Sequence, residues 1–300
     1  MTLMYSAYHL TIASEIELPE LFNLADQSQS IDVQIRYENV PDHGLDDGQK
    51  MGPFLWVAKD KLWLKIPGVA RFLVINGQEI LIDPAPDIDE DSIRVFLLGS
   101  IFGALLFQRE LLVLHGNAIR IGDHCLICVG PSGAGKSTLA AGFMRRGYQV
   151  LADDVVPITS SGDALPGFPR IKLWQDVADQ FNIKTSELRR IRPDMEKFNL
   201  PVNDLGLQQK LPVRWVYILN NENINEITVE PMTGMEKFQA LKTNTYRPKF
   251  LAAMDLKPQH FQLCGQLAGQ IHLARLTRPN QGFKLDKLID TILLDIEARA

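Results

Sequence analysis

An eight-residue segment near the middle of the chain combines glycines, a lysine and a serine at a spacing typical of phosphate binding. Gly130–Ser137 matches the pattern G-x-x-x-x-G-K-[ST], with an apolar run before it and an amphipathic run after it. In such a segment, backbone N–H groups curl round a phosphate, and the helix that follows adds the positive end of its dipole. The Lys136 ammonium would neutralise terminal phosphate oxygens, and the Ser137 hydroxyl would ligate Mg²⁺. The alternative is an ordinary glycine-rich turn, but the full match favours nucleotide binding.

Two adjacent carboxylates follow this segment. Asp153 and Asp154 end the apolar run Tyr148–Ala152. Ligands gather at the carboxyl ends of strands in an α/β sheet, so we expect both side chains to face the terminal phosphate and its metal. Mg²⁺ takes one or two carboxylates, and phosphorylation of a hydroxyl benefits from a carboxylate that accepts its proton. An exposed Asp-Asp turn is the alternative to this phosphoryl-transfer site.

Other candidates are weaker on sequence alone. His115 ends an apolar run and would return toward the phosphate segment through a turn at Gly122-Asp123, although a structural histidine is the commoner case. Arg247 could reach the nucleotide as a fixed cation, with a structural ion pair as the alternative. The segment Phe168–Trp174 combines cations with aromatic edges and could border an acceptor groove. Lys197 and Lys210 are possible phosphate contacts, and solvated surface lysines are the default.

The three cysteines do not indicate a disulfide framework or a metal site. Cys125 and Cys128 form C-x-x-C, but residues three apart in a strand point to opposite faces, and no second pair completes a zinc site. We expect buried, inert thiols there. Three cysteines in 300 residues are typical of a reduced compartment, so the cytoplasm is the expected location.

Composition excludes several classes of protein. Hydrophobic residues make up 46% of the chain and charged residues 22%, as in a globular protein. The net charge of −5 rules out a globally basic nucleic-acid binder, so we expect no nucleic-acid partner. The apolar stretch Val95–Phe107 is shorter than the roughly 20 residues that cross a bilayer, and it predicts a buried helix and no membrane partner. The opening residues lack the basic region of a signal peptide.

The pattern of elements predicts an α/β protein in two parts. Residues 1–90 alternate short β-rich runs with turns, and the proline-broken acidic segment Asp83–Asp91 suggests a boundary near residue 90. We expect a β-rich N-terminal subdomain over 1–90 and a second domain over 91–300. In the first part, the expected strands are His9–Ile12, Val33–Tyr37, Leu62–Ile66, Arg71–Ile75 and Glu79–Ile82, the last two joined by a hairpin turn at Asn76-Gly77.

The second part should begin with an apolar helix, Ser92–Arg109, that packs against a sheet. The elements expected after it are strands at Leu111–Ile119 and Cys125–Val129, a helix at Lys136–Arg146, strands at Tyr148–Ala152 and Trp215–Leu219, and a closing helix at Lys284–Glu297. The order strand, loop, helix, strand predicts a parallel pair with a right-handed crossover around the phosphate segment.

Several of these segments together resemble the catalytic core of the HPr kinase/phosphorylase family. The resemblance covers about Leu111–Ile158 and rests on Leu114–Gly116, Gly130–Thr138, Arg146–Tyr148 and Ala152–Asp154. Two further segments, Tyr8–Ile16 and Asn244–Pro248, resemble HPr-kinase-related proteins, which include kinases of lasso-peptide precursors. The fold that this resemblance implies is a P-loop HPr kinase-like core with an N-terminal β-rich subdomain.

The resemblance also implies roles for individual residues. ATP would donate its γ-phosphoryl group to a seryl hydroxyl, with Asp153 as the base and with Ser137 and Asp154 as ligands of Mg²⁺. His115 would lie near the acceptor and the phosphate, and would act in catalysis together with Lys136. The residues expected to bind the nucleotide are Gly130, Ser132, Gly133, Ala134, Gly135, Lys136, Ser137, Thr138 and Arg247.

The chain departs from the bifunctional members of that family. Thr138 follows Ser137 where those enzymes usually carry glutamate, and the glycine-rich stretch associated with phosphorylase activity is not found. The N-terminal segment is also unlike their regulatory domain. We therefore expect a kinase that acts on a serine of a peptide or small protein other than HPr, such as a lasso-peptide precursor, and that assembles as a homo-oligomer. A kinase of small-molecule hydroxyls and a non-catalytic ATP-sensing module are the alternatives.

Overall fold

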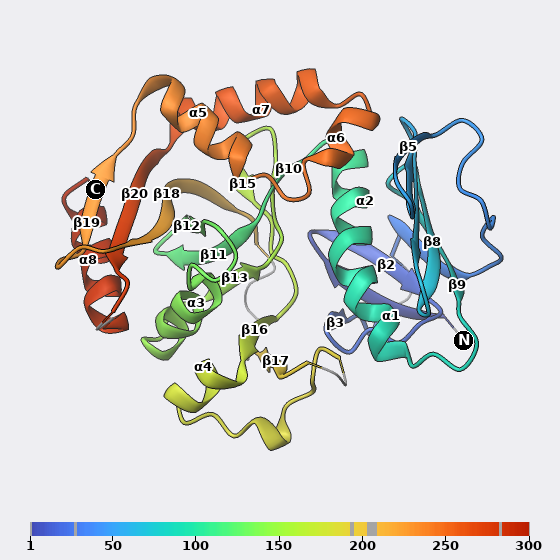
Figure 1. Cartoon of the computed structure of the whole chain (residues 1–300), viewed down its shortest axis with the longest axis horizontal. Coiled ribbons are helices and arrows are strands. Elements are labelled where there is room, and N and C mark those ends of the chain that lie inside the picture. Colours follow the sequence, from blue (N-terminus) through green and yellow to red (C-terminus); the bar gives the residue numbers. More distant parts are fainter. Residues whose placement is uncertain (1, 27–28, 193–194, 203–208, 282–283, 300) are drawn as a thin grey trace.

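Two large β-sheets lie on either side of a helical segment and form the body of the molecule (Figure 1). This computed structural model describes residues 2–26, 29–192, 195–202, 209–281 and 284–299. The chain is therefore a mixed α/β protein, and this part of the predicted fold class is confirmed. No helix in the described part of the chain has both the length and the apolar character needed to cross a bilayer.

The first sheet is built from the N-terminal part of the chain, as the β-rich pattern predicts. Its strands are β1 (Leu3–Ala7), β2 (Leu10–Ser14), β3 (Phe22–Asn23), β4 (Val33–Tyr37), β5 (Gln49–Gly52), β6 (Leu55–Val57), β7 (Lys61–Ile66), β8 (Ala70–Ile75) and β9 (Glu79–Pro84). They are arranged in the order β3-β1-β2-β4-β9-β8-β7-β6-β5. The hairpin between β8 and β9 is confirmed: Asn76 and Gly77 both have positive φ, 53° and 63°, as the central pair of a type I′ turn requires, and the Gln78 N–H closes the turn onto the Ile75 carbonyl.

The strand expected at His9–Ile12 begins one residue later, at Leu10, because His9 belongs to a turn. Tyr8 and His9 have φ of 55° and 59° and connect β1 to β2. This strained turn is fixed by burial: the Tyr8 N–H donates to the Pro166 carbonyl over 2.8 Å, and the Tyr8 ring meets Phe168 edge-on at 5.0 Å. The tip of the first hairpin is thereby anchored beside a segment that enters the candidate site.

The apolar helix lies between the two sheets and accounts for the continuous apolar run (Figure 1). It consists of α1 (Glu90–Phe96), a π-helical turn at Leu97–Ile101 and α2 (Phe102–Gln108). Asp89 caps its start by accepting a 2.8 Å hydrogen bond from the Ser92 N–H. Its side chains share a core with the first sheet, and α2 also contacts β10 of the second sheet. The domain boundary near residue 90 stays a prediction.

The second sheet is mixed and contains the elements around the phosphate segment. Its strands are β10 (Leu112–Leu114), β11 (Gly116–Ile121), β12 (His124–Val129), β13 (Val150–Asp153), β14 (Val156–Ile158), β15 (Asp163–Ala164), β18 (Leu211–Glu222), β19 (Thr228–Pro231) and β20 (His272–Pro279). One face is covered by α3 (Lys136–Arg145) and α8 (Leu285–Glu297). The other is covered by α5 (Gly234–Thr243) and α7 (Lys257–Gln270), with the short α6 (Lys249–Ala253) before α7.

The predicted parallel pair around the phosphate segment is wrong in one respect. Strands β12 and β13 run in the same direction, but β11 lies between them and pairs antiparallel with both. The tight turn at Gly122-Asp123 pairs β11 with β12, so α3 carries the chain across β11 to its other edge, where β13 pairs. The parallel neighbours of this region are instead β12 with β18, and β18 with β20.

A small two-stranded sheet completes the surroundings of the site. Strands β16 (Arg170–Trp174) and β17 (Lys197–Pro201) pair antiparallel. The chain between them forms α4 (Gln175–Gln180) and then the 3₁₀ turn at Thr185–Glu187. Figure 1 shows this unit below α3. Ile171 and Leu173 of β16 pack with Ala140 and Ala141 of α3 in a core of their own. The opposite face of β16 is therefore free to face the site.

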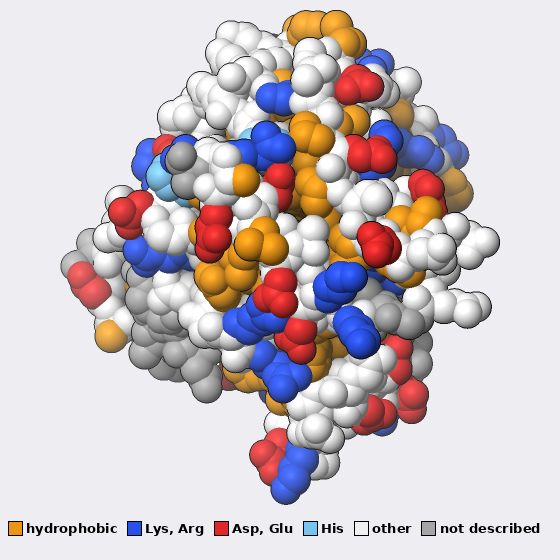
Figure 2. Space-filling model, turned by 90° about the vertical axis from the view of Figure 1, so that its left-hand side faces the viewer, with side chains coloured by type: hydrophobic (Ala, Val, Ile, Leu, Met, Phe, Trp, Pro, Cys, Tyr) orange, Lys and Arg blue, Asp and Glu red, His pale blue; other side chains and the backbone are white. Residues whose placement is uncertain are grey.

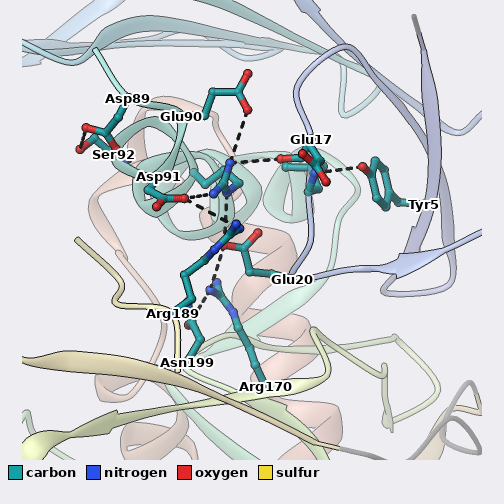
Figure 3. Close-up of polar contacts among 12 residues, drawn as sticks. Tyr5, Glu17, Glu20, Asp89, Glu90, Asp91, Ser92, Arg170, Arg189 and Asn199 are labelled. Atoms are coloured by element: carbon teal, nitrogen blue, oxygen red, sulfur yellow. Dashed lines mark hydrogen bonds and ion pairs between the residues drawn. The ribbon is translucent and has the colours of Figure 1, made fainter. Parts of the chain in front are cut away.

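A buried charged network ties the first sheet to β16 (Figure 3). Glu20 Oε1 lies 3.3 Å from Nε of Arg94 on α1 and 3.8 Å from Nη1 of Arg170 on β16. Arg170 Nη1 also donates to Asn199 Oδ1 over 2.8 Å. The Glu20, Arg94 and Arg170 side chains are each 8% exposed or less. One carboxylate thus bridges two buried guanidinium groups from different parts of the chain, and Glu90 and Asp91 add negative charge beside Arg94.

A Glu20→Gln substitution is expected to lower the free energy of unfolding by about 3 kcal/mol, because it leaves the buried Arg170 without its carboxylate. The loss should lie at the low end of the range for broken buried pairs, since Asp91 still contacts Arg94. Urea unfolding would measure it. The matched control is Glu38→Gln, which affects an exposed pair with Arg36 and should change the free energy by less than about 1 kcal/mol. Equal effects of the two substitutions would contradict this account.

Candidate active site

The glycine-rich loop connects the end of β12 to the start of α3, as the sequence predicts. Gly130, Gly133 and Gly135 have φ of 146°, 80° and 95°, values that side chains rarely allow. A Cβ atom on Gly130 would lie 2.7 Å from the Leu219 carbonyl oxygen of β18. The glycines therefore let the loop turn sharply over the sheet and lead into the start of α3, where a helix offers unpaired backbone N–H groups.

Lys136 begins α3 and folds back over the loop. Its Nζ donates to the Gly130 carbonyl over 2.8 Å and to the Pro131 carbonyl over 3.0 Å. Burial lowers its pKa, and the charges of Asp154 and Asp153 oppose that shift. The ammonium group is thus held at the mouth of the loop, where it can meet terminal phosphate oxygens.

Asn117 on β11 fixes the start of α3 relative to the carboxylates. Its fully buried side chain donates from Nδ2 to the Lys136 carbonyl over 2.5 Å, and its Cα is paired in register with Asp153. Sequence reasoning missed this residue, because its role depends on β11 lying between β12 and β13. An asparagine directly before the apolar pair Ala118-Ile119 of the strand was the available signal.

Asp153 is the last residue of β13 and lies against the phosphate loop. One carboxylate oxygen, Oδ1, accepts from the Ser137 hydroxyl over 3.2 Å, and Oδ2 accepts from the Lys172 backbone N–H over 2.8 Å. Burial raises the pKa of Asp153, and the Lys172 N–H opposes that rise. The carboxylate at this strand end therefore lies beside the Ser137 hydroxyl, whereas the family resemblance groups Ser137 with Asp154; that both aspartates face a phosphate and its metal stays a prediction.

Asp154 has a different environment from its neighbour. Its backbone lies in the left-handed region with φ of 76°, which turns its carboxylate toward Lys172 Nζ at 2.6 Å and His115 Nδ1 at 3.3 Å. Burial alone would raise the pKa of Asp154, but the Lys172 ammonium outweighs it and holds that pKa well below its usual range. Asp154 is therefore a stable anion, whereas Asp153 is the better proton acceptor.

His115 lies at the site, between the ends of β10 and β11. The hairpin of β11 and β12 brings it back to the loop, because Gly116 pairs with Val129. Its Nδ1 donates to the Asp154 carbonyl oxygen over 3.0 Å, and its backbone N–H donates to the Asn244 carbonyl over 2.8 Å. Burial lowers the pKa of His115, with the Lys136 charge adding to the effect. The imidazole thus has a fixed orientation beside the carboxylates.

A cavity of about 470 Å³ joins these groups. Its lining comes from the loop and α3, the two aspartates, β16, α4 and two further cations. These residues are His115, Ser132, Gly133, Gly135, Lys136, Ser137, Thr138, Asp153, Asp154, Lys172, Leu173, Trp174, Asp176, Val177, Gln180, Lys197 and Arg278. Most of the residues predicted to bind nucleotide therefore share one cavity with the predicted base.

Three predicted nucleotide-binding residues are not among the described residues that line the cavity. Gly130, at the start of the loop, is buried, and Ala134 packs in the core between the sheet and α3. Arg247 is exposed, with its guanidinium 5.6 Å from the centre of the Tyr246 ring, and it is not among the described residues that line the cavity. The described lining instead includes Arg278, at the end of β20. Sequence reasoning missed Arg278, because the pairing of β20 with β18 cannot be inferred locally.

The weaker sequence candidates divide in the same way. Lys197 lines the cavity and lies over the Trp174 ring at 5.1 Å, whereas Lys210 pairs with Asp163 outside it. Cys125 and Cys128 are fully buried, one in each of the two cores that flank the second sheet, as expected. Burial raises the pKa of Cys125 to about 12, so its thiol is inert at neutral pH.

The oxygen donors at the site fit Mg²⁺. Ser137 Oγ lies beside Asp153, and Asp154 follows in the same cavity, so a hydroxyl and two carboxylates are available. Mg²⁺ needs only one or two carboxylates when substrate phosphates complete its coordination. No group of three or more His, Cys, Asp or Glu side chains that could hold a metal occurs among the described residues. The donor set therefore suits a metal that arrives with phosphate oxygens.

The fold and site together define a mixed α/β protein in which a glycine-rich loop before a helix faces a carboxylate pair. No family model matches the chain, and no curated protein matches it. Among solved structures, it is similar to the Hpr(Ser) kinase/phosphatase from Coxiella burnetii, at 13% sequence identity and a TM-score of 0.27, over 62% of this chain and 91% of that chain. A similarity of this degree does not assign the chain to a family.

Proposed function

We propose that this protein is an ATP- and Mg²⁺-dependent kinase that transfers the γ-phosphoryl group to a serine hydroxyl of a peptide or small protein. The observation that carries the proposal is the 3.2 Å contact between Ser137 Oγ and Asp153, which joins the phosphate loop to the carboxylate pair inside one cavity. A loop that only holds a nucleotide needs no second carboxylate beside it. Transfer to a hydroxyl uses one carboxylate for the metal and one for the proton.

The donor would be held by the loop and its neighbouring cations. Backbone N–H groups of the loop and the start of α3 provide donors for phosphate oxygens. The Lys136 ammonium would exchange its two loop carbonyls for the terminal phosphates. Arg278, whose nearest guanidinium nitrogen would lie 4.0 Å from a Cβ atom on Gly135, supplies a second cation at the same loop.

The two aspartates would divide the remaining work. Asp154, held as an anion by Lys172, would ligate Mg²⁺ together with Ser137. Bound there, Mg²⁺ would neutralise charge on the β- and γ-phosphate oxygens. Asp153 would accept the proton of the acceptor hydroxyl. At the same time the hydroxyl oxygen would bond to the γ-phosphorus, and the bond between the γ-phosphorus and the departing ADP would break. Catalysis would come mainly from this positioning and charge compensation.

His115 would contribute orientation at the acceptor side. Its ring is fixed between the Asp154 carbonyl and the Tyr246 ring, whose centre lies 5.8 Å away. Segment 244–246 holds the strand end around it, because Tyr246 N–H donates to the Val113 carbonyl over 2.8 Å. The imidazole would thus border the space where the acceptor hydroxyl meets the γ-phosphoryl group.

Incubation with γ-labelled ATP, Mg²⁺ and a library of serine-containing peptides tests the proposal. Label is expected in peptide, at serine, with at least about a hundredfold less in the Asp153→Asn variant, as the loss of a general base implies. Separation of peptides from small solutes gives the other outcomes. Label in free amino acids or sugars from a cell extract, and none in peptides, would make the protein a small-molecule kinase. ATP binding with no labelled product would make it a nucleotide-sensing module.

A further inference from the structure

We propose that Lys172 is a further phosphate-binding residue. Its ammonium pairs with Asp154 in the free protein and contacts the γ-phosphoryl group instead when the donor and Mg²⁺ bind. This inference rests on the proposed kinase function and adds a residue that binds the γ-phosphoryl group. It concerns how the site distinguishes ATP from ADP.

Lys172 holds both aspartates from a single position. Its Nζ donates to Asp154 Oδ2 over 2.6 Å, and its backbone N–H donates to Asp153 Oδ2 over 2.8 Å. The side chain is 15% exposed and lines the cavity. The residue therefore makes one contact through its fixed backbone and another through a mobile four-carbon side chain.

The backbone of Lys172 is fixed from both sides. Lys172 pairs with Asn199 of β17, and two residues earlier Arg170 enters the buried network with Glu20 (Figure 3). Arg170 and Lys172 share one face of β16, because side chains two apart in a strand point the same way. The side chain of Lys172 can then change partner while its N–H continues to orient Asp153.

The balance of charge in the cavity favours a change of partner for the Lys172 ammonium. The free site balances Asp154 against the half-buried Lys172 ammonium. When Asp154 gives its charge to a metal ion, the ammonium loses its counter-charge, and an unpaired buried charge is costly. The γ-phosphoryl group brings anionic oxygens into the same cavity. Lys136 approaches it from the loop after β12, and Lys172 approaches from β16, which contacts β13. The transferred group would thus lie between two lysines.

The affinity ratio for a non-hydrolysable ATP analogue (AMPPNP) and ADP, both with Mg²⁺, tests this inference by isothermal titration calorimetry. Lys172→Met is expected to weaken AMPPNP binding about 10- to 100-fold, the effect of one charge-assisted hydrogen bond. ADP affinity should stay within about threefold, because ADP lacks the γ-phosphoryl group. Lys172→Arg should recover part of the AMPPNP affinity. Lys61→Met, which breaks an exposed pair with Asp47, is the matched control and should change neither affinity.

A double variant keeps the test decisive if Lys172→Met folds poorly with Asp154 left unpaired. Lys172→Met combined with Asp154→Asn removes one charge of each sign and should still show the raised ratio of AMPPNP to ADP dissociation constants. Equal loss of both affinities, or an unchanged ratio in a folded variant, would reduce Lys172 to a structural clamp and overturn the inference alone. Absence of nucleotide binding by the wild-type protein would instead overturn the proposed function and this inference with it.

Discussion

Asp153→Asn is expected to slow phosphoryl transfer by about 10²–10⁴-fold, the range for loss of a general base, while ATP affinity with Mg²⁺ stays within about threefold. The amide oxygen can still accept the Lys172 N–H, but it cannot take a proton from the acceptor hydroxyl. Since burial already disfavours the charged form of Asp153, the neutral amide should not destabilise the fold. Single-turnover transfer and calorimetric ATP binding would measure the two effects separately.

Asp163→Asn is the matched control for this experiment. Asp163 is half-buried like Asp153, but it pairs with Lys210 and is not among the described residues that line the cavity, so transfer should remain at the wild-type rate. Wild-type turnover in Asp153→Asn would show that another group accepts the proton. Loss of Mg²⁺-dependent ATP binding would assign Asp153 to the metal instead.

Lys136→Ala is expected to abolish detectable transfer and to weaken ATP binding about 10- to 100-fold, because it removes the ammonium that meets the terminal phosphates. The fold should tolerate the change. Among the described residues, Nζ donates hydrogen bonds to the Gly130 and Pro131 carbonyls alone, and both belong to the glycine-rich loop rather than to the core. Equilibrium titration with ATP and a thermal melt of the same sample would measure affinity and stability together.

Lys197 is a second lysine at the cavity. The Lys197→Ala variant allows the effect of losing Lys136 to be compared with a general loss of positive charge. Lys197 lies over Trp174 rather than at the loop, so its loss should weaken ATP binding by less than that of Lys136. Wild-type ATP affinity in the Lys136→Ala variant would exclude the loop as the phosphate site, whatever its sequence pattern.

Local patterns in the sequence predicted the elements of this fold well. Positive φ at Asn76 and Gly77 makes the predicted hairpin, and the apolar run Val95–Phe107 lies within the helix between the sheets. The glycine-rich loop, the start of α3 and the aspartates at the end of β13 are also where the pattern placed them. Each of these features depends on a few neighbouring residues, so it can be read without knowing the rest of the chain.

The remaining features depend on which distant segments meet. The insertion of β11 between β12 and β13 depends on which strands pair across the sheet, and sequence periodicity contains no information on that strand order. Lys172 and Arg278 enter the cavity from β16 and β20, whose positions are set by long-range pairing and by the network with Glu20. The sequence pattern singled out the segment Phe168–Trp174, which contains Lys172, but only as a possible border of an acceptor groove, and it contained no signal for Arg278. The nucleotide-binding role of Arg247 stays a prediction.

The left-handed backbone at Asp154 limits how this position can change. Asparagine, aspartate and glycine adopt a φ near 76° with little strain, whereas other side chains are disfavoured there. An alanine scan would therefore confuse a distorted main chain with a missing charge at this residue. Asparagine keeps the shape of the turn and removes the anion alone, and glycine keeps the turn and removes the whole side chain. In a mutational library at position 154, the asparagine and glycine variants are therefore the ones that report on the carboxylate rather than on the backbone.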